Sequence, residues 1–280
     1  MKQNIIIGIS MSLAAVLILF GCERSIGDGA RFVECDSFVF GYWSTDENMI
    51  AVGREMGLIS VGFDKGNGNN KDTFGAYSEE ESGLQRYREK SGGYGDAGYD
   101  TVYCTKWAAP RNSYHYFAEE IRDVAISYSL DWSPSLPAGS DLGEEFTLYA
   151  ISPLEYIRRG YTGKIYCGKD RAADTLAVIQ RLNGCDEVVG LCDPQDGSCK
   201  LIEGNLFDNF YGEPVIRKVS ELTEDDLRLV GGAEIYSECI LFLLHPESLP
   251  DDLSGELTIT VTTEVRTYTV PFADLEELVR

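Results

Sequence analysis

Two stretches in which apolar and polar residues alternate constrain the fold of this chain most strongly. The apolar positions are Val124, Ile126, Tyr128 and Leu130 in the first stretch, and Leu257, Ile259, Val261, Tyr268, Val270 and Phe272 in the second. A period of two is typical of a β-strand that buries one face. The phase inverts between Val261 and Tyr268, so a turn near Glu264 would keep both apolar sets on the core side. The second stretch therefore predicts an antiparallel hairpin.

The other regular segments also favour strands over helices. Extended segments are expected where aromatic and β-branched residues are frequent, at residues 32–43, 58–63 and 99–107. The continuous apolar run 239–244 is typical of a central strand buried on both faces. Helical patterns are confined to residues 172–182, 223–230, 83–90 and 272–279. We therefore expect a mainly β fold, an antiparallel, Ig-like β-sandwich with two or three short helical insertions.

Residues 64–98 are predicted to form a long surface loop, because glycine, asparagine and glutamate dominate their composition. The oxygen-rich start, residues 64–72, does not fit the EF-hand register, since Asn69 and Gly75 occupy the sixth and twelfth places. Residues 93–98 match the dinucleotide-binding pattern of glycines but lack the strand before and the helix after that the mechanism requires. We interpret both as loop, and the sequence predicts no cofactor and no metal site.

The N-terminus has the order of parts of a secretory signal. Lys2 precedes an apolar run over residues 5–20, which is followed at once by Gly21 and Cys22. A transmembrane anchor would need about 20 apolar residues, and an ordinary cleavable signal would need a small residue in place of Leu19. We therefore expect residues 1–21 to be removed, 22–31 to form a tether and 32–280 to form a single β-rich domain.

The segment Leu19-Phe20-Gly21-Cys22 resembles the lipobox of bacterial lipoproteins. The resemblance implies a diacylglycerol on the Cys22 thiol, cleavage after Gly21 and acylation of the new N-terminus. Several acyl chains together, palmitate among them, hold a protein firmly on a membrane. The implied location is the bacterial cell envelope, as an outer-membrane lipoprotein on the periplasmic or the cell-surface side.

Two further segments resemble a family of lipoproteins from gut and oral Bacteroidota, known mainly as a domain of unknown function. They are Tyr103-Cys104 with Ala108-Ala109-Pro110, and the stretch 123–146 with its Leu136-Pro137-Ala138-Gly139-Ser140-Asp141-Leu142. The resemblance implies an outer-membrane lipoprotein with a mostly β body. It brings no catalytic residues.

The chain has eight cysteines, and seven remain if Cys22 carries lipid. An odd number leaves at least one thiol unpaired. The best disulfide candidate is Cys192 with Cys199, because turn-forming residues 193–198 separate two short strand-like segments. Two buried, unpaired thiols flanking a hairpin are the alternative. The pairing of the others stays open: Cys35, Cys104, Cys167, Cys185 and Cys239.

The charge and the catalytic residue types exclude some functions. With 46 acidic and 24 basic residues the formal net charge is −22, which repels nucleic acid. His115 and His245 lack the spacing of a zinc site, so we interpret both as structural. Cys104 and His115 could form a thiol–imidazole pair, but a disulfide or a place in the core is favoured for Cys104. Adjacent acids are frequent and are interpreted as solvated faces: Asp46-Glu47, Glu119-Glu120, Glu144-Glu145, Asp225-Asp226, Asp251-Asp252 and Glu276-Glu277.

These patterns predict a lipid-anchored, non-enzymatic envelope lipoprotein that acts as a binding or assembly module. Its partners would be the membrane, through the lipid on Cys22, and a glycan or protein met by some of the 16 tyrosines and 3 tryptophans. The alternative is a carbohydrate-active hydrolase, which would need two carboxylates that converge about 5–9 Å apart in a cleft.

Overall fold

The computed structural model describes residues 31–54, 58–64, 71–99, 101–105, 115–162, 166–167, 211–231, 233–235 and 238–278. Several predictions lie outside these ranges: the signal and most of the tether, the helix at 172–182, the oxygen-rich residues 65–70, and the Cys192–Cys199 hairpin. They stay predictions.

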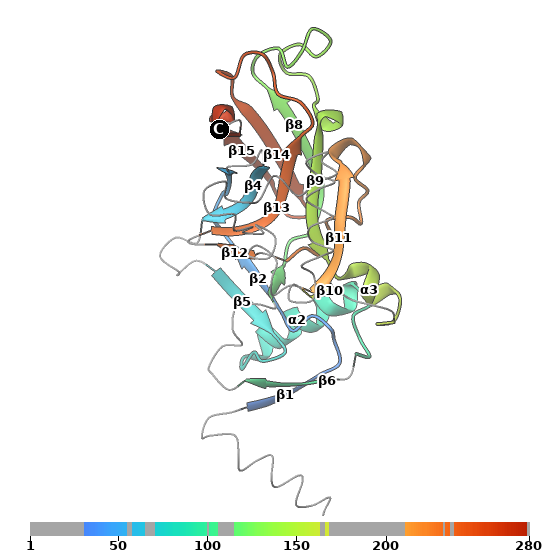
Figure 1. The fold of residues 1–280 in the computed structure, drawn as a ribbon. Helices are drawn as coiled ribbons and strands as arrows, with labels where there is room; N and C mark the ends of the chain where they lie inside the picture. Colours follow the sequence, from blue (N-terminus) through green and yellow to red (C-terminus); the bar gives the residue numbers. More distant parts are fainter. Residues whose placement is uncertain are drawn as a thin grey trace, which may run out of the picture.

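The largest sheet in the described residues has seven antiparallel strands (Figure 1). Its order is β10 (Tyr166–Cys167), β11 (Tyr211–Lys218), β9 (Phe146–Ser152), β13 (Glu238–Pro246), β4 (Leu58–Asp64) and β3 (Met49–Arg54), with β12 (Ala233–Ile235) also paired to β13. The apolar run 239–244 lies in β13, and all six of its residues are buried. The prediction of a central buried strand at this run is confirmed.

A second sheet has three antiparallel strands in the order β15 (Thr267–Phe272), β14 (Leu257–Thr263) and β8 (Ile121–Tyr128). Both alternating stretches lie in these strands, and their apolar positions from Val124 to Tyr128 and from Leu257 to Phe272 are buried. The hairpin turns where it was predicted, with the Thr263 N–H donating to the Arg266 carbonyl at 2.8 Å. The sequence therefore predicted both the strands and the face that each one buries.

One hydrophobic core lies between these two sheets. Ile59, Val61 and Phe63 of β4 meet Ile126 of β8 and Ile259 of β14 in it. Two antiparallel sheets packed face to face confirm the mainly β sandwich class. The Ig-like topology within that class stays a prediction.

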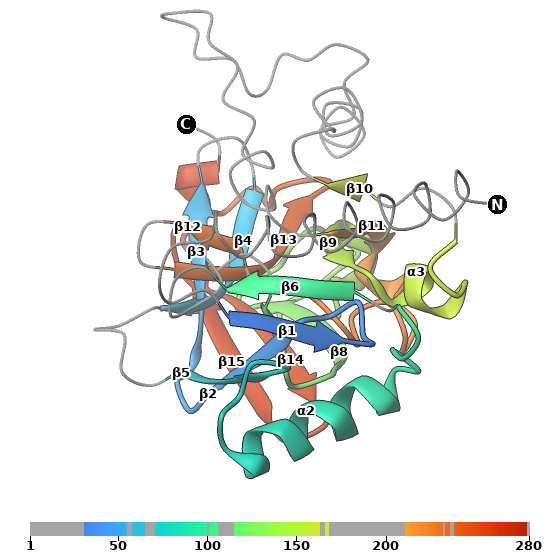
Figure 2. The same ribbon diagram turned by 90° about the horizontal axis from the view of Figure 1, so that it is seen from below.

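A second core covers the other face of the large sheet. Tyr149 of β9 and Leu243 of β13 pack there against Tyr42, Phe74 and Tyr87. Tyr42 and Phe74 come from a small sheet in the order β5 (Lys71–Gly75), β2 (Gly41–Thr45) and β7 (His115–Phe117), in which β2 and β7 are parallel. Tyr87 comes from α2 (Glu81–Gly93), which runs along one side of the body (Figure 2). A separate pair, β1 (Arg31–Cys35) and β6 (Thr101–Thr105), completes the described sheets.

The prediction of a long loop over residues 64–98 is wrong for much of that range, because it contains β5 and α2. Phe74 and Tyr87, which are scattered among polar residues, supply the apolar area that anchors these elements to the second core. The pattern at 83–90 did predict a helix, but a shorter one than α2.

The prediction of a helix over residues 223–230 is also wrong, since this segment forms turns. The capping contact is present, with Asp226 accepting from the Thr223 N–H at 2.7 Å. However, Leu227 and Val230 pack into the first core and Leu229 into the second. Residues that must reach two cores cannot lie on the single buried face of a helix.

The remaining helical pieces are short. They are α3 (Leu154–Arg158) and the 3-10 turns η1 (Gly143–Glu145), η3 (Val219–Glu221) and η4 (Leu275–Leu278). η4 lies where a short terminal helix was expected. Within the described part of the chain, no helix is long and apolar enough to cross a membrane.

Candidate binding pocket

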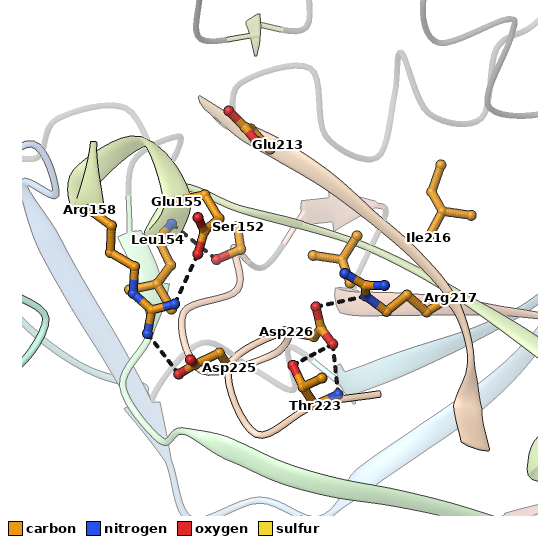
Figure 3. Close-up of a pocket in the computed structure, with 11 residues that line it drawn as sticks. Ser152, Leu154, Glu155, Arg158, Glu213, Ile216, Arg217, Thr223, Asp225 and Asp226 are labelled. Atoms are coloured by element: carbon orange, nitrogen blue, oxygen red, sulfur yellow. Dashed lines mark hydrogen bonds and ion pairs between the residues drawn. The ribbon is translucent and has the colours of Figure 1, made fainter. Parts of the chain in front are cut away.

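A polar pocket of about 420 Å³ opens beside β11 (Figure 3). Three parts of the chain line it: the end of β9 with α3 (Ser152, Leu154, Glu155, Arg158), β11 (Glu213, Val215, Ile216, Arg217) and the turns after η3 (Thr223, Asp225, Asp226). Its volume lies in the range of about 300–1,000 Å³ that is usual for ligand sites. This is the candidate functional site.

The local structure of α3 decides which of its side chains face the pocket. Its N-terminal turn is held by the Leu154 N–H, which donates to the Ser152 hydroxyl at 3.2 Å. At its C-terminal end the N–H of Gly160 reaches the Ile157 carbonyl and the N–H of Tyr161 reaches the Tyr156 carbonyl, a Schellman arrangement. Gly160 and Tyr161 both have a φ of 61°, a left-handed backbone conformation that a right-handed helix cannot contain, so α3 ends before them.

This short helix buries Leu154, Tyr156 and Ile157 and leaves the charged positions between them outside. Glu155 and Arg158 are i,i+3 neighbours and form an ion pair at 2.9 Å at the pocket wall. The buried residues of α3 therefore hold the helix on the body, and its two charged residues form part of the pocket wall.

Asp225 is the carboxylate that connects α3 with the turns after η3, because it pairs with an arginine from each. Its Oδ1 accepts from Arg158 at 2.8 Å and from Arg228 at 3.1 Å (Figure 3 shows the first contact). Hydrogen bonds from Arg158 and then from Arg228 hold the pKa of Asp225 below its usual range. In the same way, the bond to Asp225 raises the pKa of the Arg158 guanidinium. Asp225 is therefore ionised at neutral pH.

A second ion pair faces the first across the pocket. The Arg217 Nε donates to Asp226 at 3.0 Å, and Asp226 also accepts from the Thr223 N–H and hydroxyl at 2.7 and 2.8 Å. On β11, Glu213 pairs with Arg159 at the C-terminal end of α3. Each carboxylate of the pocket is thus paired with a guanidinium.

The pocket is connected to a set of buried charges behind it. Glu120, only 6% exposed, accepts from the Arg228 Nε and Nη2 at 3.1 and 3.2 Å and pairs with Arg122 at 2.5 Å. Arg228 is the link, because the same guanidinium also holds Asp225. The bond to Glu120 raises the pKa of Arg228 above its already high usual value.

The neighbouring Glu119 is buried in the same way but faces the hairpin of β14 and β15. It accepts from the Thr263 hydroxyl at 2.7 Å and from Tyr268, and it pairs with Arg266 at 3.1 Å. The interpretation of Glu119-Glu120 as a solvated face is therefore wrong. Three arginines compensate the two charges and so permit their burial. Arg122 is two residues from Glu120, whereas Arg228 and Arg266 are remote in sequence.

Asp96 is another buried carboxylate, and its role is structural. It accepts from the N–H groups of Phe38 and Val39 at 2.7 and 2.9 Å and from the Tyr161 hydroxyl at 3.0 Å. Burial raises its pKa, and these hydrogen bonds act in the opposite direction. It lies in the glycine-rich stretch 93–98, which follows a helix rather than preceding one. The structure therefore agrees with the interpretation of that stretch as loop and not as a dinucleotide site.

Both histidines lie in structural settings. His115 bonds to the Tyr77 hydroxyl at 2.6 Å through Nε2, and the two rings meet edge to face. His245 lies near the end of β13, where burial lowers its pKa. Among the described residues, no three side chains of histidine, cysteine, aspartate or glutamate gather to hold a metal ion.

Of the residues singled out from the sequence, the pocket contains only the Asp225-Asp226 pair. Cys22, Cys192 and Cys199 lie outside the described residues. The sequence analysis missed Arg158, Arg217 and Glu213, and their residue types carry no signal that would separate them from other surface charges. A comparison with protein-family models, curated proteins and solved structures finds no match for the chain.

Proposed function

We propose that this protein is a lipid-anchored lipoprotein of the bacterial cell envelope whose β body acts as a non-enzymatic binding or assembly module. The anchor is proposed from the lipobox-like segment that ends at Cys22, and the outer membrane from the resemblance to Bacteroidota lipoproteins. The binding role is proposed from the pocket beside β11.

The observation that carries the non-enzymatic proposal is the pairing of the pocket carboxylates with arginine. A glycosidase needs one carboxyl group with a raised pKa as general acid. Asp225 has the opposite property, because Arg158 and Arg228 lower its pKa. The geometry of this pocket therefore favours binding over hydrolysis.

The anchor is tested by Cys22→Ala, with Ser25→Ala as a control that leaves the lipobox-like segment intact. We expect labelled palmitate to be incorporated by the original chain and by the control, and both to sediment with membranes after a salt wash. The Cys22→Ala chain should take up no label and leave the salt-washed membranes. Retention of the Cys22→Ala chain on those membranes would contradict the proposal.

The non-enzymatic part is tested with a panel of chromogenic glycosides. We expect no turnover that depends on Asp225. Turnover by the original chain that is lost in Asp225→Asn would replace the binding module with the hydrolase.

A further inference from the structure

We propose that the pocket beside β11 binds a neutral, polyhydroxylated ligand, a short oligosaccharide, through Arg217, Asp225 and Glu213. This inference rests on the proposed function, because it names the ligand class of the binding module. It is carried by two properties of the pocket: its charges balance, and its paired side chains keep unused hydrogen-bonding atoms.

The balance of charge disfavours an ion as ligand. The four carboxylates that line the pocket are matched by four guanidinium groups, those of Arg158, Arg159, Arg217 and Arg228. A cation would have to compete with an arginine for each carboxylate, and an anion would have to compete with a carboxylate for each arginine. A neutral ligand displaces neither partner.

The unused atoms include both donors and acceptors. Asp225 accepts both of its arginines on Oδ1, so its Oδ2 has no bond to any residue that the structure describes. Glu213 is bonded through Oε1, so its Oε2 likewise has no bond to any residue that the structure describes. Arg217 donates through Nε alone, so both of its terminal nitrogens are without a partner among the described residues.

A sugar hydroxyl matches this combination, because it donates one hydrogen bond and accepts two. It can donate to the spare oxygen of Asp225 or Glu213 and accept from the terminal nitrogens of Arg217. Hydrogen bonds to ionised groups are roughly twice as strong as those between neutral groups. The existing ion pairs fix the side chains beforehand, which lowers the entropy cost of binding.

The shape of the pocket suits a short ligand. Val215 provides a small aliphatic surface for the C–H face of a sugar ring, whereas Leu154 is only 3% exposed. The Arg217 and Asp225 side chains are about half exposed, at 50% and 48%, so the ligand reaches them directly from solvent. A peptide depends on pockets for its apolar side chains, and this pocket offers little apolar surface, because Leu154 is buried and Ile216 points away from the ion pairs (Figure 3).

The experiment is an array of neutral oligosaccharides of two to six sugars, probed with the full chain in detergent. Binding to the best oligosaccharide is then measured by calorimetry for Arg217→Met, Asp225→Ala and the control Arg88→Met. Arg88 forms an exposed ion pair with Glu81 on α2, outside the pocket lining. We expect a loss of at least about tenfold in affinity for the two pocket variants and none for the control. A melting temperature of Arg217→Met within about 4 °C of that of the original chain would show that the loss is local.

Three results would overturn the inference. They are the absence of binding to every neutral oligosaccharide, binding that Arg217→Met and Asp225→Ala leave unchanged, and pocket-dependent binding to a peptide array instead. If any of these occurs while Cys22 still determines membrane attachment, the ligand class fails and the proposed anchored module stands. Shortening of the bound oligosaccharide would instead contradict the non-enzymatic part of the proposed function.

Discussion

Replacing Arg228 by methionine tests whether the buried charges behind the pocket hold the fold together. Arg228 donates two hydrogen bonds to Glu120, whose side chain is 8% exposed, and one to Asp225, whose side chain is 48% exposed. The variant would leave Glu120 with one remaining partner, Arg122 at 2.5 Å. Asp225 would keep its ion pair with Arg158 and stay hydrated, so the loss of the hydrogen bond from Arg228 to Asp225 contributes little to the change in stability.

The magnitude follows from the burial of Glu120. Removing one partner of a buried ion pair costs about 3–5 kcal/mol when the other charge is left uncompensated. Because Arg122 still neutralises Glu120, we expect a loss at or below the lower end of that range, about 2–3 kcal/mol. For a domain of this size that loss lowers the melting temperature by about 5–10 °C.

The assay is urea unfolding of the full chain followed by tryptophan fluorescence, since Trp43 and Trp132 are both buried in the first core. Arg217→Met is the matched control, because Arg217 is half exposed and its partner Asp226, whose side chain is 12% exposed, keeps two hydrogen bonds from Thr223. This variant should cost less than about 1 kcal/mol. The double variant Arg228→Met with Glu120→Leu should be more stable than Arg228→Met alone, since no buried charge is left behind. Equal losses for Arg228→Met and Arg217→Met, or losses that simply add in the double variant, would refute the reasoning.

Two further predictions concern buried polar atoms. The Ser60 hydroxyl is fully buried and has no hydrogen-bond partner among the described residues, so Ser60→Ala should leave the free energy of unfolding unchanged or raise it by up to about 1 kcal/mol. By contrast, Ser91→Ala leaves the buried Tyr42 hydroxyl without its partner at 3.3 Å and should lower the free energy of unfolding by about 1–2 kcal/mol. The reverse order in urea unfolding would contradict this. Burial lowers the pKa of His245 below 6.5, so the unfolded chain binds a proton more readily than the folded chain. The free energy of unfolding should therefore fall as the pH drops below about 6.5. This fall should be smaller in His245→Leu when both chains are melted at about pH 7.5 and 5.5.

The sequence by itself determined the sandwich. The alternation from Val124 to Tyr128 and again from Leu257 to Phe272 fixed which face of each strand is buried, because successive side chains of a strand point to opposite sides. The continuous run at 239–244 fixed the central strand, since only a strand covered on both faces can be apolar throughout. These signals are local, because the residues that carry each of them lie within a few positions of one another in the sequence.

Only the tertiary structure decided where β5 and α2 lie and what residues 223–230 form. Phe74 and Tyr87 are single apolar residues in polar surroundings, and their partners in the second core come from other parts of the chain. Likewise, Leu227 and Leu229 are drawn to different cores, which overrides the helical pattern of their segment.

The pocket and the charges behind it were decided in the same way. Glu120 and Arg228 are 108 positions apart in the sequence, and nothing near either residue indicates the other. An acid beside a second acid is a solvated surface unless the fold brings cations to it. Here the end of the turns after η3 pairs with β7, where the Phe117 N–H donates to the Val230 carbonyl at 2.8 Å, and this places Arg228 beside Glu120. Ion pairing depends on distance in space, whereas sequence periodicity reports only which side of an element is covered.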